Sequence, residues 1–281
     1  MRSLLDVPAP AKLNLFLHVT GRRADGYHLL QSAFMLIDWC DTLHFEQRAG
    51  ARLSREDLTV PLPADDLVLR AARALQAATG CTEGAHIAID KRIPAQAGMG
   101  GGSSDAATTL LALNRLWKLG LDAQALQRIG LSLGADVPFF LFGRNAWAEG
   151  VGEALQPLTL PPARFVVLKP PGGLNTGEIF SDPLLQCATK PATISFFAAD
   201  PYGFGRNDLQ PVAERYDPQI AQGIHFLRSR GLSARMTGSG NAIFALLPDG
   251  WLGSLSGGLG EGWQMRECGN MEIHPLCGWV S

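Results

Sequence analysis

A short glycine-rich stretch carries the clearest chemical signal in this sequence. Four of the five residues from Gly98 to Gly102 are glycine, and Ser103, Ser104 and Asp105 follow directly. Without β-carbons the main chain can approach a ligand closely, so its amide groups can face an anion. A helix that begins near Ser103 or Ser104 adds its unpaired N–H groups and its dipole, which suits a triphosphate. The two hydroxyls can bind phosphate oxygens or a phosphate-bound magnesium ion, for which Ser104 is the candidate ligand.

A plain linker and the two best-known nucleotide motifs fit this stretch less well. A flexible turn that only joins two elements is rarely followed at once by Ser-Ser-Asp and a helical pattern. The Walker A motif ends in Gly-Lys-Ser/Thr, and no lysine lies in this loop. The dinucleotide-binding fingerprint needs a third glycine where Ser103 stands. A phosphate-binding loop of a different kind is therefore the preferred interpretation.

The elements that must position this loop can be predicted from periodicity. The expected strands are 12–20, 32–37, 86–89, 165–168 and 242–247, and the expected helices are 65–79, 106–119, 122–133 and 218–230. The loop thus lies between a strand and a helix, and Asp122 and Gly134 mark the ends of the next helix. Prolines between positions 157 and 171 indicate two lobes, 1–155 and 156–281. The glycine-rich segment 250–262 is expected to be irregular.

The segment 94–107, with its Gly-Met-Gly-Gly-Gly-Ser-Ser-Asp-Ala-Ala core, resembles the phosphate-binding motif of GHMP kinases. The resemblance implies an α+β fold with an N-terminal ATP-binding lobe like domain 2 of ribosomal protein S5 and a C-terminal ferredoxin-like lobe that contributes to substrate binding. It also implies that ATP binds with Mg²⁺. The residues implied for ATP are Lys91, Pro94, Ala95, Gln96, Ala97, Gly98, Met99, Gly100, Gly101, Gly102, Ser103, Ser104 and Asp66. Asp66 stands where these kinases often carry asparagine, so an amide donor is missing there.

Four further segments, 10–15, 21–28, 133–140 and 236–240, resemble one branch of these kinases. Its substrate is a cytidine diphosphate-linked methylerythritol, phosphorylated on the 2-hydroxyl in the non-mevalonate route to isoprenoid precursors. A cytosine ring offers a flat face and a hydrogen-bonding edge, which aromatic side chains with a polar neighbour can bind. The residues implied for the substrate are Asn14, Tyr27, His28, Thr176, Phe180, Gly238 and Ser239. Tyr27 and Phe180 could instead be ordinary core aromatics.

The same resemblance assigns Lys12 and Asp136 to catalysis. Phosphoryl transfer to an alcohol needs an acceptor oxygen in line with the γ-phosphorus, removal of its proton, and cations that offset charge on the transferring group. Asp136 can accept the proton, and Lys12 can stabilise the carboxylate while it bridges to the phosphate or the substrate hydroxyl. Taken singly, Asp136 could be a turn or cap residue, and Lys12 could be a solvated lysine at a strand end.

Composition argues against several other classes of protein. Apolar residues make up 46% of the chain, charged residues make up 18%, and the net charge is −2, so no cationic field attracts nucleic acid or anionic lipid. No apolar run approaches the roughly 20 residues that cross a bilayer, and no signal peptide is apparent. The five cysteines never form a Cys-x-x-Cys pair, which favours a reducing cytoplasm over disulfides or structural zinc. We therefore expect a cytoplasmic enzyme that acts on a small molecule, with no nucleic-acid or membrane partner and an undetermined oligomeric state.

Two alternative functions stay open at this level. Another GHMP kinase, acting on homoserine, mevalonate or a sugar, would be indifferent to cytidine. A nucleotide-binding regulatory protein that has lost catalysis would bind ATP without consuming it, and the presence of both Lys12 and Asp136 argues against that alternative.

Overall fold

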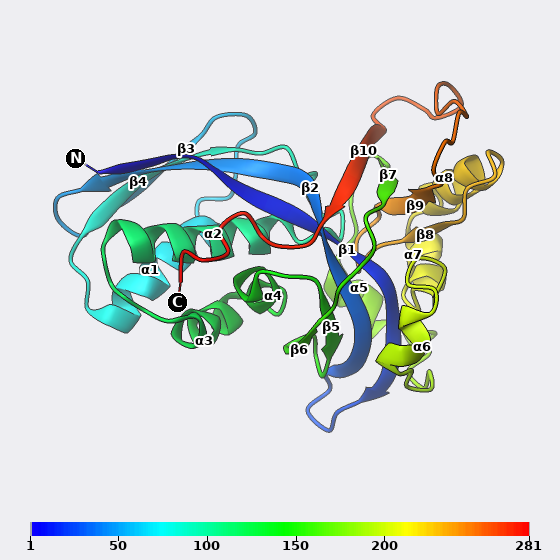
Figure 1. Cartoon of the computed structure of the whole chain (residues 1–281), viewed down its shortest axis with the longest axis horizontal. Coiled ribbons are helices and arrows are strands. Elements are labelled where there is room, and N and C mark those ends of the chain that lie inside the picture. The colour runs from blue at the N-terminus through cyan, green and yellow to red at the C-terminus, as the bar shows by residue number, and fades with distance from the viewer. Residues whose placement is uncertain (1, 281) are drawn as a thin grey trace.

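A computed structural model describes residues 2–280, and two long strands run through most of its length (Figure 1). β1 (Ser3–Arg22) and β2 (His28–Arg48) form an antiparallel hairpin with several register shifts, and such bulges bend a sheet. The strands predicted over 12–20 and 32–37 are confirmed, but both are much longer. The sequence obscured the start of β1 because Pro8 and Pro10 lie in it. They are tolerated because, among the described strands, β1 pairs only with β2.

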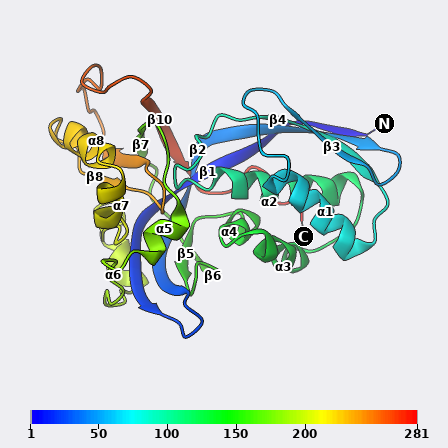
Figure 2. The same ribbon diagram turned by 180° about the vertical axis from the view of Figure 1, so that it is seen from behind.

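The first part of the chain forms a sheet covered by helices on one side, as Figures 1 and 2 both show. Two strands, β3 (Leu53–Asp57) and β4 (Gly84–Asp90), extend the sheet next to β2. The covering helices are α1 (Leu67–Thr79), α2 (Gly101–Leu116), α3 (Ala123–Leu133) and α4 (Val137–Phe142). Buried apolar side chains of both layers, such as Ile87, Leu110 and Phe140, form one core.

Local sequence signals predicted most of these helices. The predictions over 65–79 and 122–133 are confirmed, and Asp122 caps α3 by accepting a 2.7 Å hydrogen bond from the Ala125 amide. The predicted helix 106–119 in fact begins at Gly101, inside the glycine loop. Its first turn was missed because glycine has a low intrinsic helix propensity. The short helix α4 was not predicted, since its continuous apolar run shows no helical period.

The second part of the chain, from residue 146 onward, completes the sheet. The main strand order is β3-β4-β2-β10-β7-β9-β8, and off this path β1 and β5 pair with β2 and β6 pairs with β5. Its strands are β5 (Ala146–Glu149), β6 (Ala154–Pro157), β7 (Arg164–Lys169), β8 (Ala234–Met236), β9 (Ile243–Leu247) and β10 (Gln264–Met271). Its helices are α5 (Thr176–Ser181), α6 (Ile194–Ala198), α7 (Gln210–Tyr216) and α8 (Gln219–Arg228). The predictions for β7, β9 and α8 are confirmed, and 250–262 contains no helix or strand, as expected.

β10 was not predicted, and it joins the two parts of the molecule. It pairs with β7 along its length and with β2 at its end. A central cluster of buried side chains makes the same connection, because Leu13 and Met35 of the hairpin pack in it with Phe165 and Phe244. The two parts therefore share a core, and the division at residue 155 stays a prediction. Within residues 2–280 no helix is both long enough and apolar enough to cross a membrane.

Candidate active site

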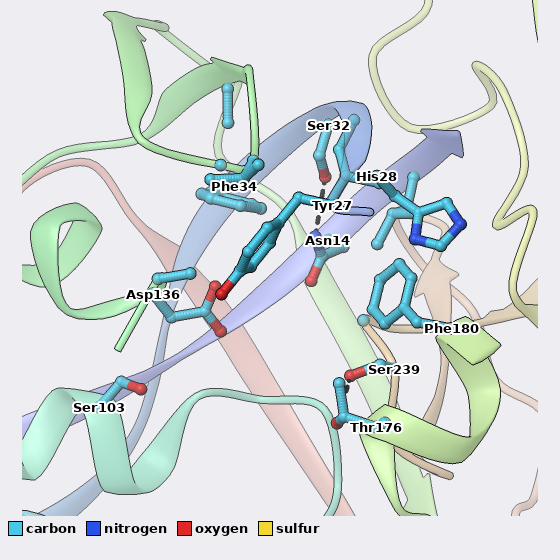
Figure 3. A pocket seen from close by; sticks show the side chains of 18 of the residues that line it. Asn14, Tyr27, His28, Ser32, Phe34, Ser103, Asp136, Thr176, Phe180 and Ser239 are labelled. Atoms are coloured by element: carbon cyan, nitrogen blue, oxygen red, sulfur yellow. Dashed lines mark hydrogen bonds between the residues drawn. The ribbon is translucent and has the colours of Figure 1, made fainter. Parts of the chain in front are cut away.

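A cavity of about 660 Å³ opens where the β1–β2 hairpin meets the start of α2, the residues before α4, and α5 (Figure 3). Its wall includes both predicted catalytic residues and all of the predicted substrate residues. Those that line it are Lys12, Asn14, Tyr27, His28, Asp136, Thr176, Phe180, Gly238 and Ser239. They come from segments far apart in the sequence, and the fold brings them around a single space.

The Lys12 ammonium and the Asp136 carboxylate form an ion pair at one end of this cavity. Lys12 Nζ lies 3.5 Å from Asp136 Oδ2, and it also donates to Asn14 Oδ1. The lysine is buried, whereas about a third of the Asp136 side chain is exposed. Asp136 occupies the N-cap position of α4 but makes no capping hydrogen bond with its side chain. Its carboxylate is therefore open to the cavity, and Lys12 is no solvated strand-end lysine.

The glycine loop packs directly against this ion pair. The Lys12 amide donates to the Met99 carbonyl at 2.9 Å. Gly100 has φ +70°, and a β-carbon there would lie 2.9 Å from the Phe140 ring and 3.3 Å from Lys12 Cγ. Glycine is required at this position both by the left-handed backbone and by the space. The loop, the lysine strand and α4 are thus held in close contact.

A second glycine-containing loop, residues 237–240, packs against the first. A β-carbon on Gly98 would lie 2.3 Å from the Thr237 carbonyl oxygen, and one on Gly240 would lie 2.0 Å from the Gly98 nitrogen. The Asn14 amide donates to Thr237 Oγ1 at 2.8 Å, which ties the second loop to β1. Glycines at the two loops thus let two main chains touch, in addition to any approach to a ligand.

Most of the predicted ATP residues lie beside the cavity and not in its wall. Ser103 lines it, whereas the segment 94–102 forms the adjoining loop and the first turn of α2. Ser104 is buried, and its hydroxyl has no hydrogen-bond partner among the described residues. Asp66 caps α1 by accepting from the Leu69 amide at 3.1 Å, and it pairs with Arg55 at 2.6 Å. Its carboxylate is therefore already engaged within the protein.

The Lys91 side chain is enclosed beneath the start of α2. Its ammonium donates to Asp105 Oδ2 at 2.5 Å and to the Asp41 carboxylate, and it lies 3.5 Å from where a Gly101 β-carbon would stand. Burial opposes its charge, but the carboxylates of Asp105 and Asp41 outweigh burial and raise the pKa of Lys91. Burial raises the pKa of Asp105. Asp41 also accepts from the Ile93 amide at 2.7 Å, so this cluster holds the chain that enters the glycine loop.

The other end of the cavity offers aromatic surfaces. The rings of His28 and Phe180 lie 5.3 Å apart with planes 33° from parallel, and Thr176 Oγ1 and Ser239 Oγ lie 2.8 Å apart. Tyr27 is 65% exposed, and its side chain points across the cavity toward Asp136 (Figure 3). Tyr27 is therefore no core aromatic. Burial first and the Arg22 charge second lower the pKa of His28, which favours a neutral ring with one donor and one acceptor.

Sequence reasoning missed several residues of this wall. Arg22 and Asp25 lie at the turn between β1 and β2, and Ser32 and Phe34 lie on β2. Ser32 Oγ accepts from Asn14 Nδ2 at 2.8 Å and so orients that amide. The Phe34 ring centroid lies 5.0 Å from Lys12 Nζ. Arg22 and Asp25 stand in the motif segment 21–28 and could have been considered, whereas nothing local marks Ser32 or Phe34.

Comparisons with known proteins point to one family. The family described as GHMP kinases N terminal domain matches residues 66–144. A relative from Verminephrobacter eiseniae, named 4-diphosphocytidyl-2-C-methyl-D-erythritol kinase, is 61% identical over 100% of this chain and 99% of its own. A relative of the same name from Paracidovorax citrulli is 62% identical, again over 100% of this chain and 99% of its own.

Solved structures agree with this result. The chain is similar to a crystal structure of 4-(cytidine 5'-diphospho)-2C-methyl-D-erythritol kinase, with a TM-score of 0.72, 37% identity, and coverage of 87% of this chain and 90% of that one. A homoserine kinase from Cytophaga hutchinsonii gives a TM-score of 0.69 at 15% identity, over 98% of this chain and 96% of that one. The second likeness concerns the fold alone, and together they confirm the predicted GHMP kinase fold of the α+β class.

Proposed function

Because this chain belongs to the family of 4-diphosphocytidyl-2-C-methyl-D-erythritol kinases, we propose that Lys12 and Asp136 perform the phosphoryl transfer that defines the family. The chain is a kinase that uses ATP and phosphorylates the cytidine diphosphate-linked methylerythritol of the non-mevalonate isoprenoid pathway. The observation that carries the residue assignment is the 3.5 Å ion pair, with an accessible carboxylate, at the glycine-loop end of the cavity.

Asp136 acts as the general base in this proposal. Its oxygen accepts the proton of the substrate's 2-hydroxyl while that hydroxyl oxygen forms a bond to the γ-phosphorus of ATP. The bond between the γ-phosphorus and the bridging oxygen breaks, and ADP leaves with the electron pair. Lys12 is buried and held by Asn14, so its ammonium keeps one position and offsets negative charge on the transferring group.

The glycine loop and the start of α2 bind the phosphates in this proposal. α2 begins at Gly101, so the amide groups of its first turn have no partner within the helix and face the loop side. The dipole of this 16-residue helix adds a positive potential at the same end. Ser103, which lines the cavity on the first turn, offers a hydroxyl next to the terminal phosphate.

The aromatic end of the cavity binds the cytidine portion. Tyr27 and Phe180 offer flat faces for stacking, and the neutral His28 ring offers one donor and one acceptor for the edge of the base. Thr176, Ser239, Gly238 and Asn14 line the same cavity and are the proposed contacts for the rest of the substrate. In this proposal the base lies between the aromatic rings and the 2-hydroxyl lies next to Asp136.

Mg²⁺ is the proposed counter-ion of ATP, and it would neutralise phosphate charge when bound. Within residues 2–280 no group of three or more acidic, histidine or cysteine side chains is arranged to hold a metal. The partnerless Ser104 hydroxyl in the first turn of α2 fits a single oxygen ligand. Phosphate oxygens and water would supply the remaining ligands, as magnesium commonly prefers.

We also propose a cytoplasmic location, since the chain's five cysteines are free.

The assignment of the base is tested by Asp136→Asn. We expect turnover to fall by about 10²- to 10⁴-fold, the range for loss of a general base, with unchanged unfolding and ATP affinity. Asp122→Asn is the matched control, because asparagine is an equally good N-cap and Asp122 does not line the cavity. Turnover of the Asp136 variant within a few-fold of the wild type would remove Asp136 from this role.

The identity of the acceptor is tested by ADP release with the cytidine-linked substrate, mevalonate and homoserine. We expect activity with the first alone, and we expect CMP to compete with it. Equal activity with mevalonate or homoserine, without inhibition by CMP, would favour another GHMP kinase. ATP binding with no ADP release from any acceptor would favour a regulatory protein.

A further inference from the structure

Arg22 is a cation at the cavity wall that the protein leaves without an acidic partner. It is the last residue of β1, and its Nε donates to the Gly26 carbonyl at 3.1 Å. Within residues 2–280 no carboxylate lies within ion-pair distance of its guanidinium. The next residue, Arg23, pairs with Asp25 at 2.7 Å and does not line the cavity. The guanidinium of Arg22 is therefore free to bind an anion.

Few other positive charges at the cavity wall could bind an anion. Among its described lining residues, Lys12 and Arg22 are the lysine and arginine, and only Lys12 is paired with Asp136. Lys12 is engaged by Asp136 and Asn14. Arg22 lies close enough to His28 that its charge, after burial, helps to lower the pKa of that ring. The wall thus has one positive charge, near the His28 imidazole, that no carboxylate offsets.

We propose that Arg22 determines specificity for a diphosphate-linked substrate by binding the substrate's diphosphate group. The inference rests on the proposed function, because the methylerythritol hydroxyl must lie at Asp136 and the base at His28 and Phe180. The diphosphate that joins them carries two negative charges and passes along the wall between these two ends. A guanidinium matches two phosphate oxygens with parallel N–H donors, which a neutral side chain cannot do.

A contact between Arg22 and the cytosine ring is the competing use of this cation. The base already has two aromatic faces and a neutral imidazole, which offers both a donor and an acceptor. Arginine offers donors only, and it would leave the amino group of cytosine unmatched. The diphosphate, which has only acceptors, is the better partner.

The experiment compares Arg22→Gln with Arg23→Gln and the wild type in a coupled assay of ADP release. We expect Arg22→Gln to raise KM for the cytidine-linked substrate roughly tenfold, the effect of one partly solvated charge-assisted bond, with kcat within about twofold. KM for ATP should not change. Arg23→Gln should leave both KM values within about twofold, since its partner Asp25 keeps a 3.2 Å hydrogen bond from the Tyr27 amide.

Inhibition by CDP and by cytidine separates the diphosphate from the base. Arg22→Gln should weaken inhibition by CDP about tenfold and leave inhibition by cytidine unchanged. Equal weakening of both inhibitors, or unchanged KM with reduced kcat, would overturn the proposal. Wild-type enzyme without activity on the cytidine-linked substrate would instead reject the proposed function, so the two failures are distinguishable.

Discussion

Replacing Gly98 with alanine should damage both stability and catalysis, and the structure gives the size of the effect. Gly98 has φ +77°, where an L-residue costs about 1 to 2 kcal/mol. The new β-carbon would lie 2.3 Å from the Thr237 carbonyl oxygen and 2.7 Å from the Gly240 nitrogen. Ordinary contact requires the two loops to separate by roughly 1 Å. Overpacking of this kind adds about 1 to 3 kcal/mol, so the total loss is about 2 to 5 kcal/mol.

The matched control is Gly80→Ala. Gly80 ends α1 with φ +67°, nearly the same conformation, but nothing lies within 4 Å of its added β-carbon. Urea unfolding should therefore show a loss of about 1 to 2 kcal/mol for Gly80→Ala and a clearly larger loss for Gly98→Ala. The difference between the two variants isolates the contact between the glycine loops.

Enzyme kinetics test the functional half of this reasoning. A displacement of roughly 1 Å in a loop that positions phosphates can reduce kcat/KM about 100-fold. We expect that loss for Gly98→Ala, with a raised KM for ATP, and none for Gly80→Ala. Equal destabilisation of the two variants, together with near-normal kcat/KM for Gly98→Ala, would refute the view that the two loops are held in contact.

Two further predictions concern buried ionisable groups. Burial lowers the pKa of His274 to about 4. Its unfolded pKa is about 6.5, so the unfolded chain binds the proton first as pH falls. Stability should therefore drop by about 2 kcal/mol between about pH 7.5 and 4.5, and urea unfolding of His274→Asn should show a shallower drop. Lys91→Met leaves Asp41 and Asp105 buried without their cation and should cost about 3 to 5 kcal/mol, with partial recovery in Lys91→Met/Asp105→Asn. Unchanged unfolding of Lys91→Met, with only a raised KM for ATP, would instead favour direct contact with the nucleotide.

The sequence predicted those features whose cause is local. The glycine-to-serine stretch marks a helix start that can face an anion, and Asp122 caps its helix through a bond to a residue three positions away. Lys12, Asp136 and the aromatic residues could be singled out because each stands in a short motif. All of the predicted substrate residues do line one cavity, although their roles there stay predictions.

Some contacts could be identified only in the folded structure, because they join residues far apart in the chain. Half of the residues of β10 are polar or charged, and it forms a strand because β7 and β2 supply partners for its main chain. Gly98 and Gly240 each resemble a flexible turn, and only their contact shows why neither tolerates a β-carbon.

The sequence by itself therefore determined the type of chemistry, because phosphate binding and proton transfer depend on residue types within short segments. The tertiary structure decided which charges are free to act. Lys91 and Arg22 are both cations next to motif residues, and no local pattern separates them. Folding encloses Lys91 between two carboxylates and leaves Arg22 at the cavity wall without one, since ion pairing depends on which distant segments pack together.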